Sequence, residues 1–142
     1  MSWVTVGGVP SLFSAGDCMY FWHGASTLEA TFQICANGFD GKYSRHGNNR
    51  YGIGVYAASF DNWQYSLDHF STPCFLGVRV MLLCKGLVNK QKMSAGLTCD
   101  DFVPAGCVGV DDVKNARIFA FGSNYDIIPT HLVEFKSRCQ LI

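Results

Sequence analysis

The sequence predicts an α+β fold in one domain. Runs typical of strands are interrupted by only two segments typical of helices, and most of the strand-like runs come late in the chain. The chain has 142 residues, of which 49% are hydrophobic and 15% charged, so it is the size of one domain and too apolar for a disordered segment. We expect a single domain over residues 1–142. Within it, we expect residues 1–16 to form an irregular N-terminal arm, with one short strand at residues 3–6.

The first helix is expected directly after a buried strand at residues 18–23. Ser26 or Thr27 can cap its N-terminus, because a side-chain oxygen there accepts a hydrogen bond from a free backbone N–H. An amphipathic face continues to Ala36, and Asn37-Gly38 ends the helix.

The second helix is expected to begin at Ser59 or Asp61 and to be ended by Pro73. Residues 74–84 follow as a nearly continuous apolar strand, which is typical of a central strand covered on both faces. The remaining expected elements are a mostly irregular connection over 86–104, strands over 105–113 and 118–121, a turn over 122–126 and a last strand over 131–136.

Two stretches place unusual residues where strands and turns meet. His23 ends an apolar strand and is followed by Gly24, which exposes backbone N–H and C=O groups to a planar ligand. Gly52 and Gly54 flank one residue just before Tyr56, in a pattern that lets a ligand lie against the backbone. Each stretch also has a plainer interpretation, a core or surface histidine and an ordinary strand with a glycine bulge.

Together these stretches resemble the poly(ADP-ribose) polymerase-like ADP-ribosyltransferases. The matching pieces occur in order from about residue 17 to residue 135: His23-Gly24-Ala25, Gly38-Phe39-Asp40, Tyr51–Ala58, Val80–Cys84 and Ile128–Val133. The C-terminal piece is most similar to the mono-ADP-ribosylating members. The resemblance implies the ADP-ribosyltransferase fold, with two small, roughly orthogonal β-sheets and flanking helices around an NAD cleft. It also implies NAD as co-substrate, a protein acceptor and no metal.

The resemblance implies three catalytic positions, His23, Tyr56 and Ile118. His23 would hold the adenosine-side ribose of NAD, and Tyr56 would offer one face for the nicotinamide ring. Ile118 stands where polymerising members carry a glutamate, so the set reads His, Tyr, Ile, as in mono-ADP-ribosylating members. An alignment shifted by one residue would put Arg117 there instead and would indicate an inactive site.

Five further residues are implied to contact the dinucleotide. The Gly24 backbone would bind the nicotinamide carboxamide, and Tyr65 would cover the second ring face. Asn62 stands near the place of a serine that touches the amide in the family, so this contact is altered here. The other two are Tyr51 and Arg45.

Residues 40–50 read as a polar loop with basic residues. In the family a loop here lies over the dinucleotide, so Lys42, Arg45 and Arg50 are candidates for contact with the pyrophosphate. A solvated loop whose charges bind nothing in particular is the alternative.

The function implied is mono-ADP-ribosylation of a protein, with an inactive binding module or an NAD glycohydrolase as alternatives. Eleven basic and eleven acidic residues cancel, which does not favour nucleic-acid binding, and no apolar run approaches the ~20 residues of a membrane span. Seven scattered cysteines show neither zinc-ligand spacing nor a disulfide framework. They suit a reducing compartment, so we expect an intracellular protein of the cytoplasm or nucleus.

Overall fold

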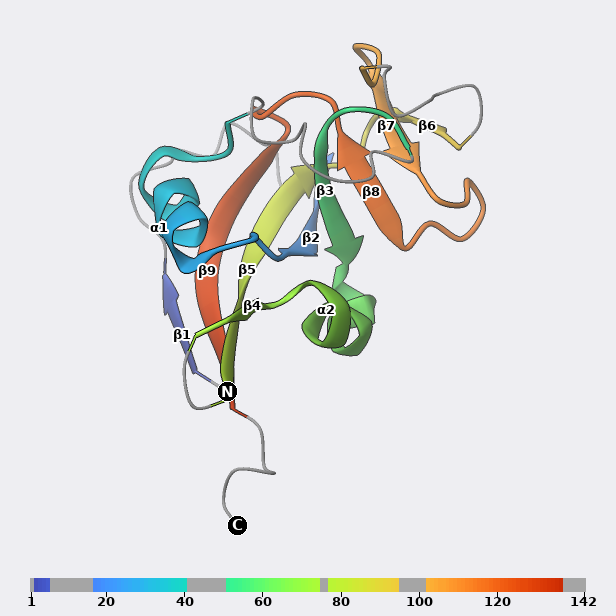
Figure 1. Cartoon of the computed structure of the whole chain (residues 1–142). Coiled ribbons are helices and arrows are strands. Elements are labelled where there is room, and N and C mark those ends of the chain that lie inside the picture. The colour runs from blue at the N-terminus through green and yellow to red at the C-terminus, as the bar shows by residue number, and fades with distance from the viewer. Residues whose placement is uncertain (1, 6–16, 41–50, 75–76, 95–101, 137–142) are drawn as a thin grey trace.

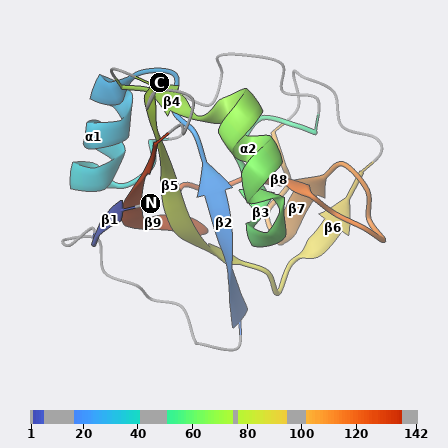
Figure 2. The same cartoon turned by 90° about the horizontal axis from the view of Figure 1, so that it is seen from below.

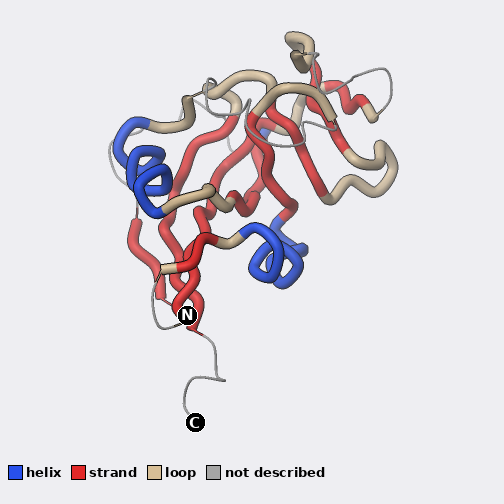
Figure 3. Tube along the Cα trace, in the orientation of Figure 1, coloured by secondary structure: helices blue, strands red, loops and turns tan. Residues whose placement is uncertain are grey.

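The computed structural model describes residues 2–5, 17–40, 51–74, 77–94 and 102–136. Strands dominate these residues, with two α-helices beside them (Figure 3). The helices are α1 (Leu28–Asn37) and α2 (Trp63–Phe70), the latter preceded by a short 3-10 helix (Phe60–Asn62). The strands are β1 (Ser2–Thr5), β2 (Cys18–His23), β3 (Val55–Ser59), β4 (Thr72–Pro73), β5 (Val78–Leu87), β6 (Gln91–Met93), β7 (Cys107–Val110), β8 (Ile118–Phe121) and β9 (Ile127–Lys136).

The strands form one sheet with a weak seam in its middle. The order is β1-β9-β5-β2-β3-β8-β7-β6, with β4 paired to β5. β2 pairs with β5 along its whole length but with β3 only through Phe21–Ser59 and Trp22–Ala58. The two sheets expected from the sequence are therefore the two halves on either side of this seam, as Figures 1 and 2 show.

The main core lies where the two halves turn the same face toward each other. The Phe21 ring of β2 meets the rings of Phe119 and Phe121 of β8 edge to face, with centroids 4.8 and 5.1 Å apart. Leu82 and Cys84 of β5 belong to this cluster, as do residues of β3 and β7. These contacts across the sheet hold the halves together where the seam provides few backbone hydrogen bonds.

The central strand β5 is covered on both faces, as predicted. Leu82 and Cys84 face the main core, against which Ile34 and Cys35 of α1 also pack. Met81 and Leu83, which alternate with these residues along β5, face a second cluster, to which Leu67 of α2 contributes. The period-two alternation of a strand therefore directs successive side chains into two different clusters.

The caps of α1 confirm the predicted helix. The Thr27 hydroxyl accepts a hydrogen bond from the backbone N–H of Ala30 at 3.0 Å. Gly38 follows the helix with φ 79°, and its N–H donates to the carbonyl of Ile34 at 2.8 Å. A positive φ favours glycine because that residue lacks a Cβ atom.

The predicted strand over residues 74–84 was wrong at its start. Gly77, with φ 72°, lies between β4 and β5, which pair as Thr72–Val80 and Pro73–Arg79. The last strand starts earlier than expected and includes Pro129, which has no N–H to donate to a ladder. A register shift between Leu83 and Cys84 accommodates it, and the Thr130 hydroxyl bonds the Leu83 carbonyl at 2.9 Å.

Candidate active site

The three expected catalytic positions lie on neighbouring strands, β2, β3 and β8. Residues paired across a sheet project to the same face. Trp22, Ala58 and Ile118 form one such row across these strands, and Tyr56 lies two residues along β3 from Ala58. Tyr56 and Ile118 therefore share a face of the β3–β8 pair, with Ala58, only 3% exposed, between them.

His23 occupies the end of β2, where β2 and β3 separate. It pairs with Leu82 and so shares the main-core face, where its ring meets the Phe39 ring edge to face at 4.8 Å. Its Nδ1 lies 2.6 Å from the carbonyl oxygen of Tyr56. The imidazole thus links the two strands beyond the last backbone pair, and the backbone rather than the ring of Tyr56 is its partner.

Burial favours the neutral form of His23. Desolvation lowers its pKa, and the hydrogen bond to the Tyr56 carbonyl offsets part of this effect. Because a carbonyl can only accept, Nδ1 must carry the hydrogen of the neutral ring. The other nitrogen, Nε2, then holds a lone pair that can accept a hydrogen bond from a hydroxyl group.

Tyr56 is anchored through its hydroxyl group. That hydroxyl donates to the Gly52 carbonyl at 2.6 Å and accepts from the Tyr51 N–H at 2.8 Å. The rings of Tyr51 and Tyr56 stack with centroids 6.2 Å apart. Desolvation is the main cause of a raised Tyr56 pKa. The phenol is therefore neutral and bound to backbone groups, so the ring and not the hydroxyl is the part of Tyr56 suited to a ligand.

Gly24 lies against the end of α2. A Cβ atom added to it would come within 1.7 Å of the Phe70 carbonyl oxygen, so only glycine fits. Two hydrogen bonds fix the same junction, from the Trp22 indole to the Phe60 carbonyl at 3.0 Å and from the Thr72 hydroxyl to the Ala25 carbonyl. Both ends of the segment that carries Tyr65 are therefore fastened to the end of β2.

Tyr65 presents its ring on α2 with 49% of the residue exposed. It stacks on His69 and lies near Phe70, and among the described residues no ring contact joins it to Tyr56. Asn62 occupies the N-cap position of α2 without making a capping hydrogen bond through its side chain. Its carboxamide is thus not used by the helix that it precedes.

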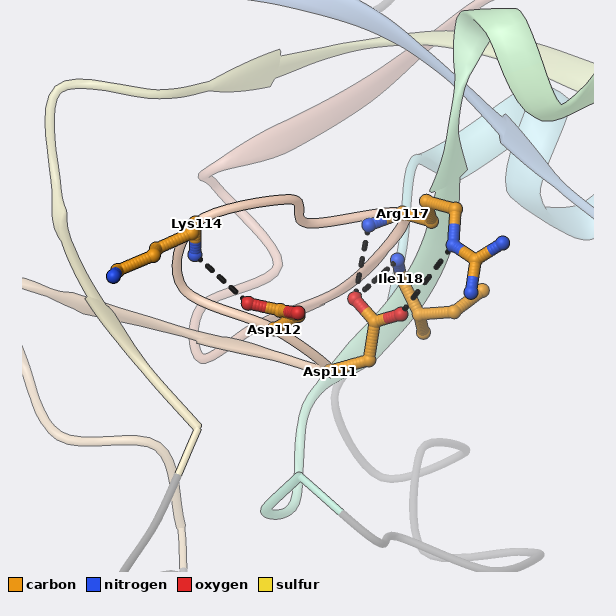
Figure 4. Close-up of polar contacts among 5 residues, drawn as sticks. All are labelled: Asp111, Asp112, Lys114, Arg117 and Ile118. Atoms are coloured by element: carbon orange, nitrogen blue, oxygen red, sulfur yellow. Dashed lines mark hydrogen bonds and ion pairs between the residues drawn. The ribbon is translucent and has the colours of Figure 1, made fainter.

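Ile118 has no carboxylate at its position, and the nearest acid in the turn is engaged elsewhere. Asp111, just after β7, accepts hydrogen bonds from the N–H groups of Arg117 and Ile118 at 2.9 and 3.0 Å (Figure 4). Asp112 accepts from the Lys114 N–H at 2.9 Å. These two carboxylates therefore stabilise the turn into β8. The other acidic pair, Asp100-Asp101, lies outside the described residues.

Three of the expected site residues fall outside the residues that the structure describes. These are Lys42, Arg45 and Arg50.

Within the described residues, no group of three or more histidine, cysteine or acidic side chains is placed to hold a metal ion. Neither α1 nor α2 is long and apolar enough to cross a membrane.

Sequence reasoning missed two contacts of the site. Phe39 packs on His23, although its position in the Gly38-Phe39-Asp40 piece signalled only a family match. His69 lies on the exposed side of α2 and stacks on Tyr65. The available signal was the spacing of four residues, which places two side chains on one helix face.

Comparisons with known proteins bear on the fold and the family of the chain. No family model matches the sequence. Over 122 residues the chain is 30% identical to protein mono-ADP-ribosyltransferase PARP10 of Mus musculus. This match covers 82% of this chain but only 12% of that protein. The crystal structure of the PARP domain of Arabidopsis RADICAL-INDUCED CELL DEATH1 matches with a TM-score of 0.68 and 22% identity, covering 84% of this chain and 67% of that one.

The chain is a PARP-like domain. The structural match confirms the predicted α+β class and ADP-ribosyltransferase fold. The sequence match supports the general ADP-ribosyltransferase family. Since the chain spans about an eighth of its curated relative, it corresponds to one part of that protein.

Proposed function

We propose that this PARP-like domain is a mono-ADP-ribosyltransferase that uses NAD as co-substrate and modifies a protein acceptor. The observation that carries the proposal is the link between His23 and the Tyr56 backbone at 2.6 Å. It holds a neutral imidazole beside the strand that carries Tyr56, and it leaves Nε2 as an acceptor. A ribose hydroxyl is the NAD group that such an acceptor suits.

Nicotinamide would bind at the same end of β2, on the side away from the ribose. Its carboxamide needs one donor and one acceptor, which the Gly24 backbone offers, and the Asn62 amide is within the same segment as Tyr65. Tyr56 and Tyr65 would flank the ring. The absence of contact between these two tyrosine rings suits this role, because rings that enclose a third ring cannot touch each other.

The reaction breaks the bond between the nicotinamide nitrogen and the ribose carbon. The bonding electron pair leaves with nicotinamide and neutralises its pyridinium charge, and the ribose carbon becomes oxocarbenium-like. A nucleophile of the acceptor then bonds to that carbon and loses its proton to solvent or to a base of the acceptor. The protein contributes by orienting NAD, since an orientation error of ~1 Å can cost 100-fold in rate.

Ile118 supports transfer of single units rather than polymers. Elongation requires a ribose hydroxyl of the previous unit to be oriented and activated, and an aliphatic side chain accepts no hydrogen bond. Asp111 does not replace the carboxylate, because the backbone N–H groups of Arg117 and Ile118 already occupy one of its oxygens. A carboxylate of the protein acceptor can assist the first transfer only.

A second candidate is a module that binds NAD-like ligands without catalysis, and a third is an NAD glycohydrolase. The lack of a carboxylate at Ile118 and the presence of Asn62 near the family's serine position favour the non-catalytic module. In the glycohydrolase, water would replace the protein acceptor. The proposed setting for any of these is a reducing intracellular compartment, with which the free thiols of Cys35, Cys74, Cys84 and Cys107 are compatible.

Nicotinamide release and label transfer separate the three candidates. The purified chain is incubated with NAD that carries a label on its adenosine half, and free nicotinamide and protein-bound label are measured. A transferase produces both, a glycohydrolase produces nicotinamide alone, and a binding module produces neither although NAD or a benzamide raises its melting temperature. No effect of either ligand at millimolar concentration would contradict nucleotide binding itself.

A further inference from the structure

We propose that His69 is a positioning residue that holds the Tyr65 ring in the orientation needed to stack on nicotinamide. This inference rests on the proposed function, because it assigns His69 a role in the same site. The imidazole and the phenol lie nearly parallel, with an interplanar angle of 21° and centroids 4.1 Å apart. One face of Tyr65 is therefore covered from within its own helix.

A hydrogen bond fixes the covering ring. His69 Nδ1 lies 2.9 Å from the backbone carbonyl oxygen of Tyr65, four residues earlier in α2. Because that carbonyl can only accept, Nδ1 donates the hydrogen, and the imidazole plane is tied to the helix that carries Tyr65. The stack is thus held by the backbone and not by ring contact alone.

The opposite face of Tyr65 is not covered by its other aromatic neighbour. The Phe70 centroid lies 5.9 Å from Tyr65 and 6.3 Å from His69. If Phe70 lay on the opposite face of Tyr65 from His69, the Phe70 and His69 centroids would be separated by nearly the sum of their distances to the Tyr65 centroid. Phe70 therefore lies beside the edge of Tyr65, and the face away from His69 is the one that can receive a ligand ring.

This arrangement reduces the ordering that ligand binding requires. An exposed tyrosine on a helix exchanges between rotamers, and a ligand that stacks on it must select one of them. With His69 stacked behind it and Phe70 at its edge, Tyr65 is already held. The gain applies only to ligands that carry the nicotinamide-like ring, and ADP-ribose, which lacks this ring, gains nothing.

The test compares the binding of a benzamide and of ADP-ribose to the native chain and four variants. His69→Ala removes the ring and the hydrogen bond, His69→Phe restores only a ring, and His69→Asn keeps a side-chain donor near the Tyr65 carbonyl without a ring. Asp68→Ala, an exposed neighbour on α2, is the matched control. Melting temperatures show whether each variant remains folded, and KM for NAD and kcat are measured wherever transfer is detected.

We expect His69→Ala and His69→Asn to weaken benzamide binding about 3- to 10-fold, and His69→Phe and Asp68→Ala to stay within about 2-fold of the native chain. ADP-ribose affinity and kcat should change less than about 2-fold, and KM for NAD should follow benzamide. Unchanged or tighter benzamide binding by His69→Ala would overturn this inference alone, as would rescue by asparagine rather than phenylalanine. A native chain that binds neither benzamide nor NAD would overturn the proposed function as well.

Discussion

The two strands that flank β3, β2 and β8, contribute chemically opposite side chains to the candidate site. On one side, His23 ends β2 with a neutral imidazole whose Nδ1 is bound to the Tyr56 carbonyl at 2.6 Å. On the other side, Ile118 begins β8 with an aliphatic side chain, and the carboxylate nearest in the turn, Asp111, is bound to backbone N–H groups. The polar group suited to hold a ribose is present, whereas a carboxylate able to activate one is absent from that strand.

Under the proposed function, this difference assigns the holding of NAD and the extension of a polymer to separate parts of one sheet. The end of β2 is fixed to α2 by the close approach of Gly24 to Phe70, and to the 3-10 helix before α2 by the Trp22–Phe60 hydrogen bond. The start of β8 is fixed by a turn. Changes at the first place should damage binding and catalysis, and changes at the second should affect stability or product length.

The largest effect is expected from Gly24→Ala. The added Cβ atom would lie 1.7 Å from the Phe70 carbonyl oxygen, so β2 and α2 must move apart. We expect a loss of about 3 kcal/mol or more in the free energy of unfolding, together with loss of benzamide binding. Urea denaturation measures the free energy of unfolding.

Gly106→Ala is the control, because Gly106 has open space around its Cβ position and differs from an ordinary residue only in its positive φ of 81°. Its expected cost is about 1 kcal/mol. Equal costs for the two variants would contradict the packing account.

His23→Ala should reduce NAD cleavage at least about 100-fold, because the ribose loses its acceptor and its orientation. The rate of nicotinamide release is the measurement. His131→Ala, a change of the half-buried histidine on β9, serves as the control and should remain within about 3-fold of the native rate. Native activity in a folded His23→Ala protein would remove His23 from the mechanism.

Asp111→Ala should cost about 1–3 kcal/mol in the free energy of unfolding, since two backbone N–H groups lose a charged acceptor. Asp112→Ala should cost less, because Asp112 is exposed and accepts one hydrogen bond that water can replace. Urea denaturation compares the two variants. If Asp111→Ala left stability unchanged but abolished transfer, the carboxylate would belong to the chemistry and not to the turn.

Acid should weaken the fold through His23. Its pKa is lowered in the folded state, so the unfolded chain binds the proton first as the pH falls. The stability contribution is complete above the unfolded pKa of about 6.5 and is lost as the pH falls below it. The free energy of unfolding of the native chain should therefore decrease more steeply between pH 7 and pH 5 than that of His23→Gln. Parallel curves would show that His23 is equally solvated in both states.

Ser66→Ala should have the smallest effect. Ser66 follows Tyr65, is 1% exposed, and its buried hydroxyl has no hydrogen-bond partner among the described residues. Removing an unsatisfied hydroxyl should change the free energy of unfolding by less than about 1 kcal/mol, in the stabilising direction if at all. Benzamide binding should be unaffected, whereas Asn62→Ala should weaken it. Weaker benzamide binding by Ser66→Ala would show that Ser66, and not Asn62, contacts the amide.

The sequence predicted local structure better than pairing. Residues 18–23 were predicted as a strand with the same limits as β2. The caps of α1 were predicted as Ser26 or Thr27 and as Asn37-Gly38, because capping depends on nearby residues alone, and the structure selects Thr27 and Gly38. The β4–β5 hairpin was missed because Gly77 lies inside an apolar run that reads as one strand. β6 was missed because its three residues depend on parallel pairing with β7, a contact distant in sequence.

The site shows the same division. A resemblance drew attention to His23, Tyr56 and Ile118, and the structure places them on adjacent strands. No pattern in the sequence predicted that His23 would bind the backbone of Tyr56, because that contact exists only where the seam between β2 and β3 ends. The anchoring of the Tyr56 hydroxyl by Tyr51 and Gly52 likewise depends on the turn between them.

The mass of the modified protein tests the central claim most directly. The chain and candidate acceptor proteins are incubated with NAD, and intact-protein mass spectrometry is combined with mapping of the modified residues. The account predicts nicotinamide release and a single ADP-ribose unit at each modified residue, because Ile118 supplies no carboxylate for elongation. A ladder of polymer on one residue would contradict it, since a carboxylate would then have to reach the place assigned to Ile118.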